Sequence, residues 1–385
     1  MSKKPSRSNL REFLELSRAA MVAALKTFVL AESPSTEKAA AESCAQIIAA
    51  EWRKRGVELR LFPQKERGSH IQAVWRPAGR QPAGQLLVLG HYDTVYASGT
   101  LRKMPFRISA GKAFGPGVYD MKAGIVQALF ALDALLQTKA KLKKQIVFLW
   151  TSDEEIGSDS SRKLIESQAR RSDAVFVLEP SLGPKGLLKT ARKGVGDVEL
   201  IVHGHASHAG LAPEKGVNAI HELALQIASI QSWNDPRRGI SINADIIEGG
   251  TRSNVIAEKA RAIFDVRALH ISDMRKIEKR LHSLKPITRG ATLEITGGFT
   301  RSPLERKVSG PLFLRAKHLA HHMGFELGEG TAGGASDGNF TSALGIPTLD
   351  GLGAVGDGAH SSHEHILINS MPARAALLGA LLHDS

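Results

Sequence analysis

The chain has 385 residues, more than one ordinary hydrophobic core needs, so we expect two domains. A single cysteine, Cys44, excludes an intrachain disulfide, and 51 Lys and Arg against 38 Asp and Glu give a net charge of +13. The basic residues are scattered, only 5% of residues are aromatic, and no nucleic-acid motif accompanies them. We therefore expect solvated basic surfaces and no nucleic-acid partner.

The N-terminal region lacks the pattern of an export signal. Residues 1–9 are basic and polar, and Arg11, Glu12, Glu15 and Arg18 interrupt the apolar residues that follow. A signal peptide needs a continuous apolar stretch, and a membrane helix needs about 18 apolar residues, which no segment provides. These features predict a cytoplasmic protein without a membrane partner.

Three short apolar runs predict strands of a mostly parallel sheet. Each run is too short for a helix and does not alternate with polar residues, which is typical of strands buried on both faces. Between the first two runs, Ile125, Leu129, Leu132 and Leu136 recur at helical spacing. The alternation of strand and helix predicts an α/β domain. The runs are residues 86–89, 146–149 and 174–178.

A different pattern begins at about residue 193. Apolar and polar residues alternate over 198–202 and 260–266, as in half-exposed antiparallel strands. Amphipathic helices are predicted around 220–227 and 272–284, so the order of elements indicates a four-stranded sheet with two helices, an α+β domain of ferredoxin-like type. Because the α/β pattern returns after 303, we interpret 193–303 as an insertion into a domain formed by 1–192 and 304–385.

Side chains of the kind that bind metal follow each of the three buried strands. His91 follows the first strand, Glu154 and Glu155 the second, and Glu179 the third, while Asp120 opens the helix between the first two. Ligands bind at the carboxyl ends of strands in open α/β sheets. The sequence therefore predicts that these side chains converge.

Two local patterns within this set suggest a division of roles. His91 and Asp93 point the same way along an extended backbone, so Asp93 can orient His91 by accepting its second N–H. Glu154 and Glu155 would repel each other if buried without a cation, which favours one as a metal ligand and the other as a proton acceptor. The alternatives are a His-Asp pair in an ordinary turn and a solvated acidic turn that includes Asp153.

The motifs also resemble those of a known family. They are similar in order and spacing to the zinc aminoacylases and exopeptidases that include acetylornithine deacetylase, succinyl-diaminopimelate desuccinylase and the glutamate carboxypeptidases of the carboxypeptidase G type. The resemblance covers nearly the whole chain and is nearest to the glutamate carboxypeptidases. It rests on His91-x-Asp93-x-Val95, on Gly115-Pro116-Gly117-x-x-Asp120-Met121-Lys122-x-Gly124, on Asp153-Glu154-Glu155-Ile156-Gly157-Ser158, on Glu179-Pro180, on Ser207-His208-Ala209-Gly210, on Ser253-Asn254-Val255 and on Ala359-His360 with Glu364.

The resemblance implies a di-zinc site, for which Co²⁺ or Mn²⁺ could substitute. Asp120 would bridge the two ions, with His91 and Glu179 on one and Glu155 and His360 on the other. Glu154 would be the general base, and Asp93 would support His91. The family pattern also implies a cis peptide after Asp120. Sequence spacing alone leaves His363 as an alternative to His360.

The inserted domain would act in dimerisation and as a lid. The resemblance implies a homodimer in which His208 reaches the active site of the partner subunit. Asn254 and Arg267 are candidates for binding the substrate carboxylate, although a solvated strand face is an alternative for Arg267. Thr331 stands where the glutamate carboxypeptidases have an arginine, so we do not expect a strict preference for glutamate.

The function implied is zinc-dependent hydrolysis of an amide bond beside a free α-carboxylate. The substrate would be a dipeptide or an N-acyl amino acid, and the enzyme a metallocarboxypeptidase of glutamate carboxypeptidase type or an amidohydrolase. One alternative is an acetylornithine or succinyl-diaminopimelate deacylase. Another is a catalytically silent dimeric scaffold, against which Glu154 counts, since a silent relative needs no base.

Overall fold

The computed structural model describes residues 7–79 and 81–385, which form two compact units. The first unit ends at Thr190 and resumes with Arg306–Ala332 and Ser336–Ser385, while the second comprises Ala191–Glu305 and Gly333–Ala335. The predicted limits of the insertion, 193 and 303, fall inside the second unit. Most of the basic segment 1–9 lies outside the described residues. Among the described residues, no helix is long and apolar enough to cross a membrane.

The first unit is built on a six-stranded sheet with the order β1-β2-β6-β3-β7-β14. Strands β6, β3, β7 and β14 are parallel neighbours, and β2 runs antiparallel to both β1 and β6. This confirms the predicted mostly parallel sheet, whose central strands are buried along nearly their whole length. The strands are β1 (Glu58–Phe62), β2 (His70–Trp75), β3 (Gln85–His91), β6 (Gln145–Thr151), β7 (Ala174–Val177) and β14 (Thr348–Leu349).

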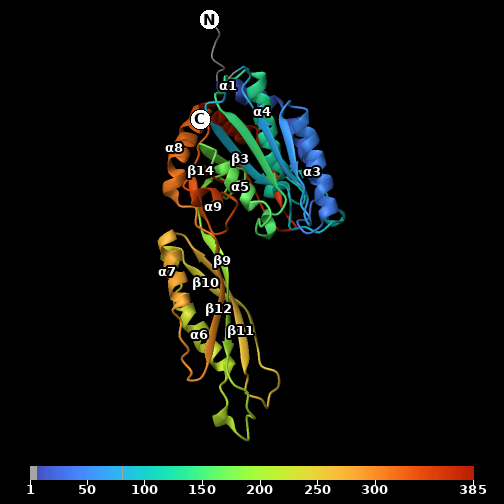
Figure 1. Ribbon diagram of the computed structural model, residues 1–385. Helices are drawn as coiled ribbons and strands as arrows, with labels where there is room; N and C mark the ends of the chain where they lie inside the picture. The colour runs from blue at the N-terminus through green and yellow to red at the C-terminus, as the bar shows by residue number, and fades with distance from the viewer. Residues whose placement is uncertain (1–6, 80) are drawn as a thin grey trace. The chain divides into compact units, whose positions relative to one another are not determined.

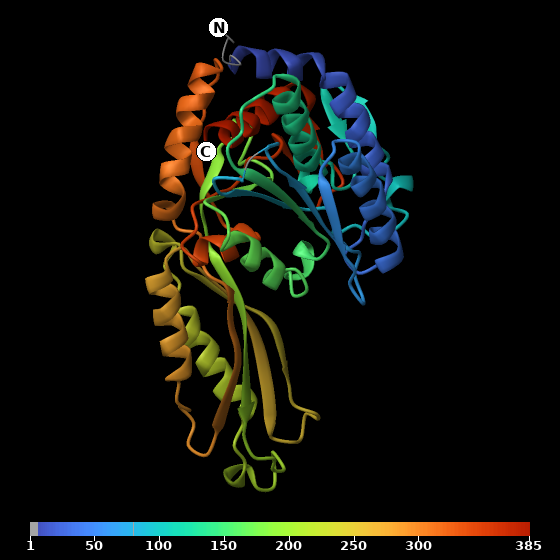
Figure 2. The same ribbon diagram turned by 45° about the horizontal axis from the view of Figure 1, so that its top comes forward.

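Helices cover both faces of this sheet (Figures 1 and 2). On one face, Trp52 of α3 packs against Phe148 and Trp150 of β6, in a core shared with α4 and α10. On the other face, α5 and α9 bury Ile165 and Phe340 against β3, β6 and β7. The helices are α1 (Arg7–Leu16), α2 (Arg18–Leu30), α3 (Lys38–Arg53), α4 (Ala123–Gln137), α5 (Arg162–Ala169), α8 (Arg306–His322), α9 (Gly338–Ala343) and α10 (Met371–Asp384).

Two smaller sheets complete the first part of the fold. A four-stranded sheet has the order β15-β16-β5-β4, and β13 pairs with β8. The sequence patterns did not predict these strands, because at two to five residues they are too short for periodicity to register. Their bounds are β4 (Arg107–Ser109), β5 (Lys112–Phe114), β8 (Leu188–Arg192), β13 (Glu329–Ala332), β15 (Gly356–Asp357) and β16 (His365–Leu367).

The second unit is an antiparallel sheet of order β10-β11-β9-β12 with α6 and α7 packed on one face (Figure 1). The predicted alternation appears directly in β9, where Val198, Leu200 and Val202 are buried and their neighbours are not. The order of elements matches the predicted α+β domain. The elements are β9 (Gly194–His203), α6 (Ala219–Gln231), β10 (Ser241–Gly249), β11 (Lys259–Ala268), α7 (Ile271–His282) and β12 (Thr292–Arg301).

Candidate metal centre

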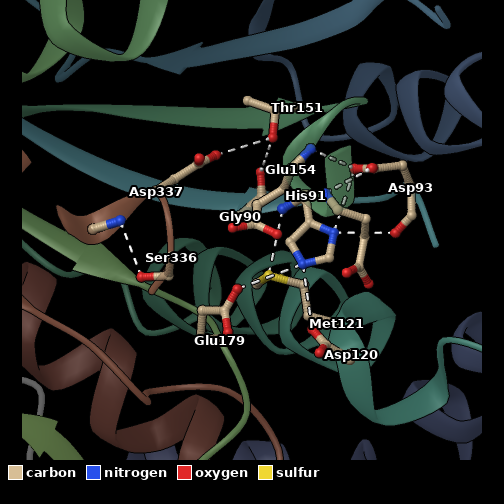
Figure 3. A network of polar contacts seen from close by, with 12 residues as sticks. Gly90, His91, Asp93, Asp120, Met121, Thr151, Glu154, Glu179, Ser336 and Asp337 are labelled. Atoms are coloured by element: carbon tan, nitrogen blue, oxygen red, sulfur yellow. Dashed lines mark hydrogen bonds and ion pairs between the residues drawn. The ribbon is translucent and has the colours of Figure 1, made fainter. Parts of the chain in front are cut away.

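The predicted strand-end residues come together in the first unit (Figure 3). His91 is the last residue of β3, Glu154 and Glu155 lie in a short helical turn directly after β6, and Glu179 follows β7. Because β6, β3 and β7 are neighbouring parallel strands, their carboxyl ends share one edge of the sheet. Asp120 reaches the same place from the turn that precedes α4.

Two groups of metal-type ligands share Asp120. His91 Nε2 lies 3.3 Å from Asp120 Oδ1 and 3.5 Å from Glu179 Oε1. His360 Nε2 lies 3.1 Å from the Glu155 carboxylate and 3.5 Å from Asp120 Oδ2. Within each group the ligand atoms are all within 4.8 Å of one another. The two oxygens of Asp120 thus face different imidazoles, as a bridging carboxylate requires.

The structure also distinguishes His360 from His363. His360 has a φ of 61°, a left-handed conformation that is unusual for a residue with a side chain, and its imidazole lies beside Asp120 and Glu155. The imidazole of His363 instead contacts the Ser361 hydroxyl at 3.0 Å. Of the two alternatives left by the sequence, His360 is therefore the one in the ligand group.

The electrostatics of these groups favour a cation. Burial alone lowers the pKa of His91, but contacts with Asp120, Asp93 and Glu179 raise it well above its usual value. Contacts with Asp120 and Glu155 raise the pKa of His360 to about 10. The carboxylates therefore attract positive charge to both imidazoles. Divalent ions provide such charge, and this mixture of imidazole and carboxylate donors suits zinc, cobalt or manganese.

Asp93 connects His91 to the turn that carries Glu154. His91 Nδ1 lies 3.1 Å from the backbone oxygen of Asp93 and 3.4 Å from its carboxylate. The same carboxylate accepts the backbone N–H groups of Glu154 at 3.3 Å and Glu155 at 3.2 Å, and the Ser35 hydroxyl at 2.7 Å. Because Nδ1 of His91 contacts Asp93, the other ring nitrogen, Nε2, is the one that faces Asp120 and Glu179.

Glu364 fixes the turn that presents Asp120. Its buried carboxylate accepts backbone N–H groups from Gly117 at 3.1 Å, Tyr119 at 2.8 Å and Asp120 at 3.0 Å, and the Tyr96 hydroxyl at 2.7 Å. Burial raises the pKa of Glu364, and these donors partly offset that effect. The peptide between Asp120 and Met121 is cis, as the family pattern predicts. The sequence placed Glu364 in a motif without giving it a role.

We expect Glu364→Gln to weaken zinc binding by about 10- to 100-fold, the usual effect of losing a group that orients metal ligands. A glutamine has one acceptor oxygen, and its NH₂ group would face donors that the second carboxylate oxygen now satisfies. Zinc affinity would be measured by competition with a chelator, and thermal stability in parallel. Tyr96→Phe, which removes a single hydrogen bond to the same carboxylate, is the matched control. Unchanged zinc affinity in Glu364→Gln would rule out this positioning role.

A second polar network lies behind the Glu154 turn. Asp153 Oδ2 accepts the backbone N–H and hydroxyl of Ser160 at 2.8 and 2.7 Å, and Ser158 donates its hydroxyl to Asp337 at 2.5 Å. The buried His70 contacts the hydroxyls of Ser152 and Ser160, each at 3.1 Å. Sequence reasoning missed His70, because no local pattern links a residue of β2 to this turn. Figure 3 shows Asp337 close to Thr151 on β6, which donates a longer hydrogen bond to it.

His208 and Asn254 lie on adjacent segments of the second unit. The backbone N–H of Ala209 donates to the backbone oxygen of Asn254 at 3.0 Å. His208 Nδ1 accepts backbone N–H groups from Gly210 and Leu211, both at 3.1 Å. An Nδ1 that accepts two hydrogen bonds leaves the proton of a neutral imidazole on Nε2, so the exposed ring presents Nε2–H as a donor.

Arg267 is held by groups of its own unit. Asp265 accepts hydrogen bonds from Nε at 2.8 Å and Nη2 at 2.9 Å, and the Gly333 carbonyl accepts one from Nη1 at 3.0 Å. Asp265 and Arg267 are two residues apart on β11, so strand periodicity could have predicted the pair. A guanidinium has five N–H donors, and one hydrogen on each terminal nitrogen of Arg267 makes no hydrogen bond to the described residues.

Comparison with known proteins places these residues in a family. Residues 87–384 match the model of peptidase family M20/M25/M40. The chain is 33% identical to carboxypeptidase G2 of Pseudomonas sp. (strain RS-16) over 307 residues, which cover 78% of this chain and 73% of the relative. It is 27% identical to succinyl-diaminopimelate desuccinylase of Stenotrophomonas maltophilia (strain R551-3), with 88% and 92% of the two chains covered.

Solved structures agree on the fold. A dinuclear metal-binding peptidase of Bacillus subtilis superposes with a TM-score of 0.70 and 15% identity, covering 96% of this chain and 98% of the other. The family match spans most of β3, the inserted unit and the C-terminal helix α10. The chain therefore belongs to peptidase family M20/M25/M40 and is a metal-dependent hydrolase.

Proposed function

We propose that this protein is a di-zinc hydrolase that cleaves the amide bond beside a free α-carboxylate in dipeptides or N-acyl amino acids. The observation that carries the proposal is the pair of ligand groups that share Asp120, with Glu154 in the turn beside Glu155. The family membership and the carboxypeptidase relative support it. The dinuclear metal content of the Bacillus subtilis structure is consistent with two ions.

The proposed ligands are His91 and Glu179 for one ion and Glu155 and His360 for the other, with Asp120 shared. Zinc held by these residues would supply Lewis acidity, which polarises the substrate carbonyl and lowers the pKa of water so that hydroxide is available near neutral pH. Glu154 accepts the proton of the attacking water and donates it to the leaving nitrogen, so the C–N bond breaks to give a neutral amine. The Asp93 carboxylate contacts both His91 and the backbone N–H of Glu154 and so holds the two in position relative to each other.

His208 is proposed to stabilise the oxyanion that forms on the substrate carbonyl. Its Nε2–H is available as a donor, because Nδ1 accepts two backbone hydrogen bonds. The family resemblance suggests that this donor serves the site of the partner subunit in a homodimer formed through the inserted domain. A two-fold interface makes the exchange of His208 reciprocal.

Mixed dimers test this exchange. A His208→Ala subunit paired with a Glu154→Gln subunit should have one working site, because one subunit retains Glu154 and receives His208 from the other. We expect about half of the sites in such a dimer to be active, while each parent homodimer stays inactive. Activity would be compared before and after subunit exchange, with exchange measured by native mass spectrometry. Exchanged dimers without regained activity would exclude action across the interface.

Two groups of the second unit are proposed to recognise the substrate carboxylate. Arg267 can use the terminal hydrogens that remain when Asp265 and Gly333 hold the rest of its guanidinium. Asn254 is exposed on the segment beside His208. Thr331 lies exposed in β13 and offers no charge to a glutamate side chain. We therefore propose a required α-carboxylate with tolerance of the adjacent side chain.

A matched series of N-acyl amino acids ending in Glu, Gln, Met, Leu and Ala, each also as the C-terminal amide, tests this specificity. Losing a charge-assisted contact costs about 1.5–3 kcal/mol, so the amides should fall by about one to two decades in kcat/KM. The acids should differ from one another by less than that. Comparable cleavage of the amides would refute the carboxylate requirement. A preference for Glu above about a hundredfold would show that another basic group of the enzyme binds the glutamate side chain of the substrate.

A second candidate is deacylation of N-succinyl-diaminopimelate or N-acetylornithine. The desuccinylase relative favours it, because its match covers 88% of this chain. Both compounds belong in the same kinetic series. A kcat/KM for either that exceeds every simple N-acyl amino acid by more than about a hundredfold would favour this alternative.

A further inference from the structure

Two histidines on the exposed face of α8 form a pair outside the candidate metal centre. Helix α8 packs Leu312, Ala316 and Leu319 into the core, while His318 and His322 are exposed one turn apart. Their Nε2 atoms lie 3.1 Å apart, and their rings meet edge to face with centroids 4.3 Å apart. Neither residue belongs to the two ligand groups that share Asp120.

This separation matches two ligands of one metal ion. Zinc binds an imidazole nitrogen at about 2.0–2.1 Å, so nitrogens 3.1 Å apart would subtend an angle of about 98° at such an ion. That angle lies between square-planar and tetrahedral geometry. A hydrogen bond between two ring nitrogens also requires one unprotonated nitrogen, which is the form that binds metal.

Because His318 and His322 lie on one helix, their two rings are held on the same face. Residues four apart share one face of an α-helix, and the buried side of α8 fixes which face this is. His321 is also exposed, but its ring centroid lies 6.1 Å from that of His322, so its ring is not part of the close pair. The pair supplies two ligands, so water would fill the remaining coordination positions of a bound ion.

We propose that His318 and His322 form a peripheral binding site for a divalent first-row transition ion. The preference of imidazole donors for Cu²⁺, Ni²⁺ and Zn²⁺ over Mg²⁺ and Ca²⁺ sets the ligand class. When transition metal is in excess, each chain therefore binds one ion more than the hydrolytic centre holds.

The test is calorimetric titration with NiCl₂ of untagged protein that carries two Zn²⁺ per chain, from which all further zinc has been removed. Zinc released into the buffer is measured in the same samples, so exchange at the hydrolytic centre is counted separately. We expect one additional Ni²⁺ per chain, with affinity reduced roughly tenfold or more in His318→Ala and in His322→Ala. The neighbouring His321→Ala is the matched control and should stay within about twofold of wild type. MgCl₂ should give no uptake.

Three results overturn the site. One is the absence of additional Ni²⁺ in zinc-loaded wild type, and another is wild-type affinity in both single variants. The third is an equal loss in His321→Ala, which would mean that a diffuse histidine surface and not this pair binds the ion. Because the three side chains are exposed, circular dichroism and hydrolytic activity should be unchanged in all variants, which establishes that each is folded.

Discussion

Glu154→Gln should retain both metal ions and lose at least about 10²-fold in kcat, and up to about 10⁴-fold, the range for general-base catalysis. The amide keeps the size of the side chain but cannot accept the proton of the attacking water. The backbone N–H of residue 154 would still donate to Asp93, so the turn should hold its shape. Steady-state kinetics and metal analysis on the same preparation separate turnover from metal loss.

Two glutamates provide controls for this substitution. Glu155→Gln should lose metal from the group that contains His360, because the 3.1 Å contact between these residues belongs to the proposed ligand set. Glu166→Gln, on α5, removes a charge from an i,i+4 pair with Arg162 and should leave activity unchanged. Activity of Glu154→Gln within a few-fold of wild type would assign the base to another residue.

Asp120→Ala should abolish activity through loss of metal. Wild type is expected to hold two ions per chain, and the alanine variant should hold neither tightly, since Asp120 contributes an oxygen to both ligand groups. Removing it also leaves His91 and His360 without the carboxylate that lies between them. Metal analysis after gentle purification, followed by titration with Zn²⁺, measures both occupancies.

Asp159 is exposed, so Asp159→Ala serves as the control: it removes an aspartate outside the proposed ligand set and should leave metal content unchanged. Retention of one tightly bound ion in Asp120→Ala would mean that the two groups are independent and that no carboxylate bridges them. Full activity of wild type at one ion per chain would reject the dinuclear model itself.

Sequence reasoning predicted the strand ends well because their chemistry is concentrated in short motifs. The buried runs before His91, Glu154 and Glu179 are continuous and apolar, and this pattern alone aligns their carboxyl ends in a parallel sheet. The structure brings the three residues together as that pattern predicted. Whether they bind zinc stays a prediction.

What the sequence did not predict depends on contacts between distant segments. Glu364, Asp337 and His70 act on turns that lie 244, 179 and 82 residues away from them, and no periodicity connects such positions. The resemblance assigned His360, spacing alone left His363 open, and the structure places His360 beside Asp120 and Glu155. The side-chain partner of Arg267 was accessible from strand periodicity and was overlooked.

The contact between Glu364 and the Asp120 turn has a consequence for biosynthesis. The two residues are 244 positions apart, and the inserted unit is made between them. At elongation rates of about 5–20 residues per second, Asp120 leaves the peptidyl-transferase centre about 12–50 s before the carboxylate that fixes its turn. His360 is made just before Glu364. The candidate metal centre is therefore incomplete until the last stage of synthesis, and the proposed tight binding of metal would begin then or in the released protein.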